Sequence, residues 1–433
     1  MKCILIVVAL VFLAPPLLLL LARGTAAAAA ARVIEGGPDP LSSTRSLAQA
    51  IDQAHGDGRT LHILFVHGIR AEGPGASQPF TTRLAYALGD AVISRSRRLP
   101  LTLSPWPQDA TMSGKPNPES PLARTPIWKT RQDWDRSQPF IERTVIAAPS
   151  GSVMVDEVNY WPLLFPLKCR FLLQREHDLA GSDTAHLKLC AAQGWLTPTE
   201  LANLLKKPPR SGGGAYANRR LKQEILDWGL SDAVIALGPM RHYLNDMIDK
   251  ACAQAIEAGP RDRYVVVSES LGSFVVLDAL AERRGSVAAL LDRTADLYFF
   301  ANQFQLLELA RIEGIPPATA ITPSTVGSPP TVPAGMAPPS PLEALVAWAR
   351  KDTVTAQAAP GAVAGLEKQV VAFSDPSDLL TFNVPPLKDV RVVNLYDRQG
   401  FNLFGLLANP IRAHTGHVDN PAVWKVLMRR QIP

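Results

Sequence analysis

From Thr60 onward, short apolar runs alternate with stretches in which apolar residues recur at helical spacing. The runs are rich in Val, Ile, Leu and Phe and predict strands at 61–66, 264–267, 296–301, 369–373 and 390–396. The helical spacing predicts helices at 80–93, at 220–258 with a break near Gly229 or Gly238, at 273–283 and from Pro421. The run 61–66 is apolar almost throughout, as in a central strand buried on both faces. The pattern therefore predicts an α/β fold, with a mostly parallel central sheet and helices on both faces.

Two segments interrupt this alternation. Residues from about 99 to 220 are rich in Pro, Ser and charged side chains at 104–139, although 153–161 has the pattern of a strand. Residues 316–341 contain nine prolines, which no core element tolerates. We expect both segments to be insertions in a single domain that spans residues 33–433.

The first 32 residues are expected to form a targeting segment. Lys2 precedes an apolar run from Cys3 to Ala22, and Arg23 and an alanine tract at 26–31 follow it. These are the parts of a secretory signal peptide, but a run of about 20 residues also matches a membrane anchor. Both alternatives stay open. Either one places the rest of the chain outside the cytoplasm, periplasmic or secreted, with membrane association through residues 3–22 if the segment is retained.

Beyond Cys3, the chain has three cysteines. Cys169 and Cys190 flank a polar segment, and a disulfide between them would close a loop of about 20 residues. Alternatively, these two and Cys252 are reduced, buried side chains. The sequence favours neither.

Composition narrows the class of protein. Of 433 residues, 47% are apolar and 19% charged, which is too apolar for intrinsic disorder. The formal charge of +5, from 44 Lys and Arg against 39 Asp and Glu, is spread along the chain and predicts no nucleic-acid partner. The chain has no C-x-x-C and no H-E-x-x-H motif, which argues against zinc, and we expect no cofactor. The oligomeric state stays open.

Candidate chemistry is concentrated in the segment Ser268-Glu269-Ser270-Leu271-Gly272, between a predicted strand and a predicted helix. A sharp turn there would hold the Ser270 hydroxyl clear of the sheet, provided that the residues two before and two after are small. Gly272 meets this need fully, and Ser268 stands where glycine is usual. We therefore predict that Ser270 is a nucleophile, the alternative being an ordinary strand-to-helix turn.

A serine nucleophile needs a base, and the base needs an acid to orient it. Asp378, in the loop after the strand at 369–373, is the predicted acid, and Asp375 is the alternative unless it only caps a turn before Pro376. His414 is the predicted base and His417 its alternative, and either histidine could instead be structural.

A fourth element of the predicted site lies upstream. His67 and Gly68 end the strand at 61–66, and the backbone N–H groups of Ile69 and Leu271 are expected to bind an oxyanion, with His67 and Gly68 in support.

Together these residues resemble the α/β-hydrolase superfamily, most closely its bacterial serine esterase and lipase-like members. The resemblance rests on Phe65-Val66-His67-Gly68, on the turn around Ser270, and on the loops at 373–378 and 414–417, in the chain order Ser, Asp, His. It implies a parallel central sheet, an acyl-enzyme on Ser270 and no metal.

The expected function is hydrolysis of a carboxylic ester, from a small molecule or a lipid, through the triad Ser270, Asp378 and His414. An acyltransferase would use the same residues with an alcohol as acceptor. A catalytically silent member of the fold would bind a partner through its insertions. A membrane-associated scaffold is the weakest alternative, because it leaves the order of the triad unexplained.

Overall fold

The computed structural model describes residues 34–35, 44–68, 75–89, 91–103, 127–148, 151–173, 184–206, 229–238, 240–282, 285–309, 340–350, 368–388, 390–399 and 410–429. Within these residues, a mixed sheet has the strand order β1-β9-β8-β7-β6-β2-β5-β4-β3. The strands are β1 (Ile34–Glu35), β2 (Leu61–Val66), β3 (Val92–Pro100), β4 (Phe140–Ala148), β5 (Gly151–Asn159), β6 (Arg263–Glu269), β7 (Thr294–Phe300), β8 (Gln369–Ser374) and β9 (Arg391–Tyr396). From β9 to β5 all neighbouring strands are parallel, and β1, β4 and β3 join antiparallel at the two edges.

The central strands are buried on both faces, which explains their nearly continuous apolar sequences. In β2, Leu64 and Val66 point into one hydrophobic core, and Ile63 and Phe65 point into the other. The strands β6, β7 and β8 alternate between the same two cores. The prediction of a mostly parallel α/β sheet is confirmed.

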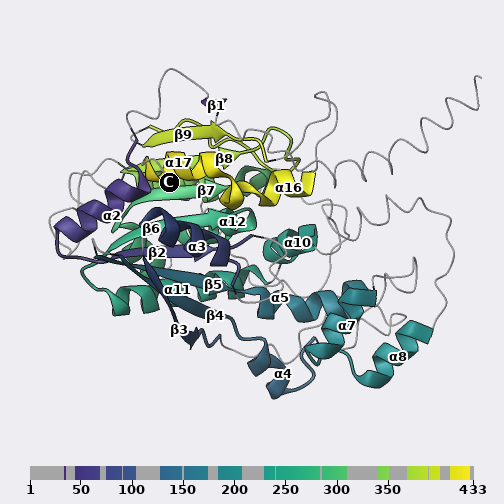
Figure 1. The fold of residues 1–433 in the computed structure, drawn as a ribbon. Helices are drawn as coiled ribbons and strands as arrows, with labels where there is room; N and C mark the ends of the chain where they lie inside the picture. The colour runs from purple at the N-terminus through teal and green to yellow at the C-terminus, as the bar shows by residue number, and fades with distance from the viewer. Residues whose placement is uncertain are drawn as a thin grey trace, which may run out of the picture.

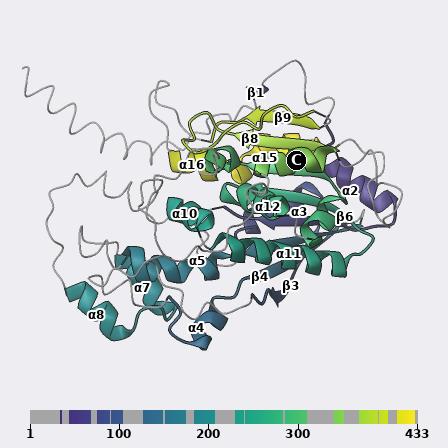
Figure 2. The ribbon, with the colours of Figure 1, turned by 180° about the vertical axis from the view of Figure 1, so that it is seen from behind.

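Helices cover both faces of the sheet. The face in front in Figure 1 is covered by α2 (Leu47–Gly56), α3 (Gln78–Ala87) and α17 (Pro421–Met428). The opposite face, in front in Figure 2, is covered by α11 (Arg241–Ala258), α12 (Leu271–Ala281), α13 (Gly285–Leu291) and α15 (Pro341–Arg350). Because the sheet lies between two helical layers, its strand ends are the parts left for a site.

Two expectations need correction. The helix expected at 80–93 ends at Ala87, and Val92 begins β3 instead. Part of the range 99–220, expected as an insertion, lies inside the sheet: β5 pairs directly with β2, and β4 pairs with β5. β4 mixes buried and half-buried positions because it lies near the edge, so its sequence lacks a continuous apolar run.

The remainder of that range forms a helical region beyond the carboxyl ends of β2 and β5, at the lower right of Figure 1. It contains α4 (Arg131–Arg136), α5 (Trp161–Leu167), the π-helix η2 (Lys168–Leu173), α7 (Thr184–Ala192) and α8 (Pro198–Lys206). A disulfide between Cys169 and Cys190 joins η2 to α7, whereas Cys252 is a buried thiol whose pKa burial raises. The sequence left open whether Cys169 and Cys190 form a disulfide or are reduced, and the structure contains the disulfide.

Some expectations fall outside the described residues: the targeting segment at 1–32, the proline-rich segment except for Ser340 and Pro341, and Ile69. No helix in the described part of the chain is long and apolar enough to cross a bilayer.

Candidate active site

The predicted triad comes from three strands whose carboxyl ends lie at one edge of the sheet. Ser270 directly follows β6, Asp378 lies in the loop after β8, and His414 lies in α16 (Pro410–Thr415), after β9. Because β6, β8 and β9 belong to the parallel part of the sheet, their carboxyl ends share one edge. The fold therefore brings together residues that are far apart in the sequence.

The three side chains form a continuous chain of hydrogen bonds. The Oγ of Ser270 lies 2.7 Å from Nε2 of His414, and Nδ1 of His414 lies 2.7 Å from Oδ2 of Asp378. An ionised carboxylate only accepts hydrogen bonds, so Nδ1 has the proton and Nε2 accepts the serine hydroxyl. All three side chains are buried, with Ser270 only 1% exposed. This arrangement suits removal of the hydroxyl proton by His414.

Asp378 is held in its ionised form. Burial alone would raise its pKa, but the hydrogen bond and the electrostatic interaction with His414 lower it overall. The N–H of Leu380 donates to Oδ1 at 2.9 Å, and the Thr381 hydroxyl donates to Oδ2. The carboxylate is thus fixed in position and charged, as a group that orients a histidine must be.

The backbone at Ser270 is strained. Its φ of 53° and ψ of −121° lie in a region that side chains other than glycine rarely adopt, and such strain costs about 1–3 kcal/mol. The N–H of Ser270 donates to the carbonyl of Phe300, at the end of β7, over 2.7 Å. A Cβ on Gly272 would lie 2.2 Å from the carbonyl oxygen of Val66, so only glycine fits there. Despite the serine at 268, the turn has the sharp geometry that the sequence predicted.

The segment after β2 packs against this turn. A Cβ on Gly68 would lie 2.6 Å from Cβ of Ser270, so the two backbones meet closely. The Tyr160 hydroxyl lies 2.9 Å from the carbonyl oxygen of His67 and 3.0 Å from that of Gly68. The His67 ring stacks on Tyr160 with 4.1 Å between ring centroids. Tyr160, which sequence reasoning did not single out, thus fixes the chain just before Ile69.

Of the two residues predicted to bind an oxyanion, the structure describes one. Leu271 begins α12, where the first backbone N–H groups lack partners within the helix. Ile69 lies outside the described residues.

The alternative acid and base have other partners. Asp375 accepts hydrogen bonds from the backbone N–H groups of Ser377, at 2.8 Å, and Gln399, at 2.6 Å. Nδ1 of His417 lies 3.0 Å from both carboxylate oxygens of Asp397. In the structure, His414 therefore contacts Asp378 rather than Asp375, and Ser270 contacts His414 rather than His417.

His417 and Asp397 form a second buried pair beside the triad. Burial alone would lower the pKa of His417, but the Asp397 carboxylate raises it overall. The Asn420 side chain also donates to Asp397, over 3.3 Å. Sequence reasoning missed this pair, although Asp397 directly follows the predicted strand at 390–396 and could have been found by that position.

A pocket lies beside Ser270, with about 260 Å³ of space between its atoms, part of it open to solvent. Two of its residues, Lys168 and Asp232, form a buried ion pair with Nζ and Oδ1 2.7 Å apart. The lining residues are His67, Gly68, Tyr160, Trp161, Leu164, Phe165, Lys168 and Asp232.

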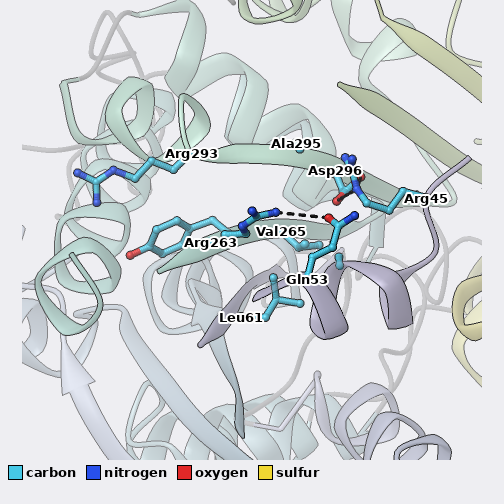
Figure 3. A pocket seen from close by; sticks show the side chains of 10 residues that line it. Arg45, Gln53, Leu61, Arg263, Val265, Arg293, Ala295 and Asp296 are labelled. Carbon is cyan, nitrogen blue, oxygen red and sulfur yellow. Dashed lines mark hydrogen bonds and ion pairs between the residues drawn. The ribbon is translucent and has the colours of Figure 1, made fainter. Parts of the chain in front are cut away.

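A second pocket lies at the opposite, amino-terminal ends of β2, β6 and β7 (Figure 3). Arg45 and Asp296 meet there, with Nη2 of the arginine 2.7 Å from Oδ1 and its Nε 3.0 Å from Oδ2. The Arg293 side chain points away from this pair. No residue of the predicted triad lines this pocket.

No protein-family model matches the chain, and neither a curated protein nor a solved structure matches it. Among the residues that the structure describes, no group of three or more His, Cys, Asp or Glu side chains is placed to hold a metal ion.

Proposed function

We propose that this chain is a serine hydrolase of carboxylic esters with an α/β-hydrolase fold. The observation that carries the proposal is the chain of contacts from Ser270 through His414 to Asp378, with 2.7 Å at each step. The strained backbone of Ser270 supports it, because backbone strain at non-glycine residues is concentrated at active sites. The order Ser, Asp, His, after the parallel strands β6, β8 and β9, is the order of that fold.

In the proposed mechanism, Oγ of Ser270 attacks the ester carbonyl carbon while Nε2 of His414 takes the hydroxyl proton. Asp378 stabilises the resulting imidazolium and does not itself take the proton. The carbonyl oxygen becomes an oxyanion, which the N–H groups of Leu271 and Ile69 would bind. His414 then protonates the departing alcohol, and water attacks the acyl-enzyme by the same steps to release the acid.

The proposal includes a location outside the cytoplasm. The bond between Cys169 and Cys190 supports this, because disulfides persist in oxidising compartments and are rare in the cytosol. The apolar run from Cys3 to Ala22 supports export independently.

The test is turnover of p-nitrophenyl acetate and butyrate by the full-length chain. Wild type should release p-nitrophenol, with a burst equal to the enzyme concentration if the acyl-enzyme accumulates. Ser270→Ala should lose the reaction, whereas Ser268→Ala, a serine two positions earlier, should retain it. Formation of glycerol esters when glycerol is added would indicate acyl transfer. Equal rates for wild type and Ser270→Ala would contradict the proposal.

A further inference from the structure

Gln303 contacts the predicted catalytic base and has no part in the mechanism proposed above. Its Nε2 lies 3.4 Å from Nε2 of His414, the same atom that contacts the Ser270 hydroxyl at 2.7 Å. Gln303 and Ser270 are each 1% exposed, so burial does not separate the amide from the reacting atoms. A molecule that is hydrogen-bonded to this nitrogen of His414 therefore has the Gln303 amide as a neighbour.

The backbone at the end of β7 places Gln303 there. Ala301 has a φ of 49°, in the left-handed region that residues with a side chain rarely adopt. Its N–H donates to the carbonyl of Phe373 over 3.0 Å. Gln303 then precedes α14 (Phe304–Glu308), but its side chain does not cap this helix and contacts His414 instead. Backbone strain of this kind is concentrated at functional sites.

The neighbouring amide, that of Asn302, has partners at both of its ends. Its Oδ1 accepts from the Ser273 hydroxyl at 3.0 Å, and its Nδ2 donates to the carbonyl of Phe382 at 3.1 Å. Oε1 of Gln303, by contrast, is buried and has no hydrogen-bond partner among the described residues. Buried polar atoms without a partner are rare and call for an explanation. Gln303 thus has an unused acceptor close to the base, whereas Asn302 is fully used by the structure around it.

The acyl-enzyme creates a need for such an acceptor. Once Ser270 is acylated, it has no hydroxyl proton, and the water that attacks the acyl group donates one hydrogen to Nε2 of His414. An acceptor for the second hydrogen would fix the direction of the water's lone pairs. Because the oxygen and nitrogen of an amide are about 2.3 Å apart, Oε1 of Gln303 lies within about 5.7 Å of that His414 nitrogen. One water molecule bridges such a gap with two hydrogen bonds of about 2.8 Å.

We propose that Gln303 binds the hydrolytic water of the acyl-enzyme, an inference that rests on the function proposed above. The water donates one hydrogen to His414 and the other to Oε1 of Gln303, and its oxygen attacks the acyl carbon. The first proton passes to His414, which returns it to Oγ of Ser270 as the acyl bond to that oxygen breaks. The second stays on the new carboxylic acid. An alcohol has one hydroxyl hydrogen and needs no second acceptor, so Gln303 favours water over an alcohol.

The experiment measures how the acyl-enzyme divides between water and methanol. The full-length chain is given p-nitrophenyl butyrate with added methanol, and methyl butyrate and butyric acid are quantified. Gln303→Met replaces the amide by a thioether, a weak acceptor, and should raise the ratio of ester to acid at least about fivefold over wild type. Gln303→Leu, which has no acceptor and a different shape, should raise it as far.

The ratio of two products cancels the concentration of active enzyme, so partial misfolding does not imitate this result. Gln305→Met is the matched control, because the Gln305 amide donates to the carbonyl of Asn383 and not to His414. It should leave the ratio at the wild-type value.

An unchanged ratio in both Gln303 variants would overturn the inference while the proposed function stands, and so would an equal rise in Gln305→Met. Wild type that forms methyl butyrate but no butyric acid would overturn the inference and turn the proposed function into acyl transfer. Failure of wild type to cleave the ester or to react with a fluorophosphonate would overturn the proposed function itself, and the inference with it.

Discussion

The two ends of the parallel strands differ in their backbone strain and in how their charged side chains are paired. At the amino-terminal ends, Nε and Nη2 of Arg45 donate to both carboxylate oxygens of Asp296. At the carboxyl ends, the backbone of Ser270 is strained, and its hydroxyl is hydrogen-bonded to His414, which contacts Asp378. A paired arginine and aspartate contribute to stability, whereas backbone strain is typical of functional sites.

The amino-terminal pocket also shows why arginines alone do not indicate a site. The terminal nitrogens of Arg263 contact Asp57 at 2.5 Å and Gln53 at 3.4 Å, although its Nε lacks an acceptor in the described structure. Arg293 donates to the carbonyl of Pro260 at 2.7 Å, and Figure 3 shows its side chain directed away from Arg45. These arginines do not converge on one point. We therefore expect the amino-terminal ends of the strands to contribute to stability and the carboxyl ends to catalysis.

Apart from variants that remove Ser270 itself, Asp378→Asn is expected to reduce catalytic activity most. The substitution keeps the shape of the side chain but favours the wrong tautomer of His414, so kcat for a p-nitrophenyl ester should fall about 10⁴-fold. The same substitution at Asp375, whose carboxylate only accepts backbone hydrogen bonds, should retain far more activity. Equal losses in the two variants would show that the acid has been misassigned.

Asp296→Asn should have the opposite effect to Asp378→Asn, because it should lower stability and leave catalytic activity unchanged. It leaves Arg45, whose side chain is only 12% exposed, without its ionic partner, and breaking a pair that is largely buried costs up to about 3–5 kcal/mol of unfolding free energy. Activity per folded molecule should stay at the wild-type level, because Asp296 lies at the far end of the strands. Denaturant unfolding and active-site titration measure the two quantities.

Asp57→Asn is the control, at a carboxylate that pairs with Arg263 of the pocket lining. The side chain of Asp57 is 42% exposed, so this pair should contribute at most about 1 kcal/mol. A comparable loss of stability in both variants would contradict the role assigned to burial.

The pair of His417 and Asp397 should make stability depend on pH. Because the folded-state pKa of His417 is raised, its contribution is fully present below about pH 6.5 and is lost as the pH rises through the raised value. Asp397 is the main cause, with Asp378 and Glu269 adding to it. Wild type should therefore exceed Asp397→Asn in stability by more at pH 6 than at pH 9, by about 1.4 kcal/mol for each pKa unit. A gap that stays constant across this range would contradict the assignment.

The smallest effect is expected from Ser268→Ala. The Ser268 hydroxyl is buried and has no hydrogen-bond partner in the described structure, so its removal should change the unfolding free energy by less than about 1 kcal/mol. Thermal unfolding measures this. A large loss would show that Ser268 has a structural partner beyond the described residues.

Much of the sheet could be predicted because its central strands are buried on both faces. The strands at 61–66 and 369–374 are uniformly buried, and their apolar runs predicted them to within a residue. The sequence did not predict β3, because this strand lies at the edge of the sheet and several of its residues are polar or exposed. Val92 is 66% exposed, and the strand includes Arg97 and Arg98. An edge strand is determined by its partner more than by its own pattern.

For the site, the residues after strand ends could be predicted, but their contacts could not. Asp378 and Asp375 are three residues apart in one loop, and only the fold decides which of them reaches His414. Trp161 and Lys168 were beyond prediction for a different reason. Their place beside Ser270 depends on how α5 packs across the ends of other strands, which no local pattern contains.

The most direct test of the central claim is covalent labelling by a fluorophosphonate between pH 6 and 9, with the modified residue located by peptide mass spectrometry. The account predicts an adduct on Ser270 in wild type and in Ser268→Ala, and none in Ser270→Ala or in heat-unfolded wild type. Folded wild type that stays unlabelled throughout this range, or an adduct on another serine, would contradict the assignment of Ser270 as the nucleophile.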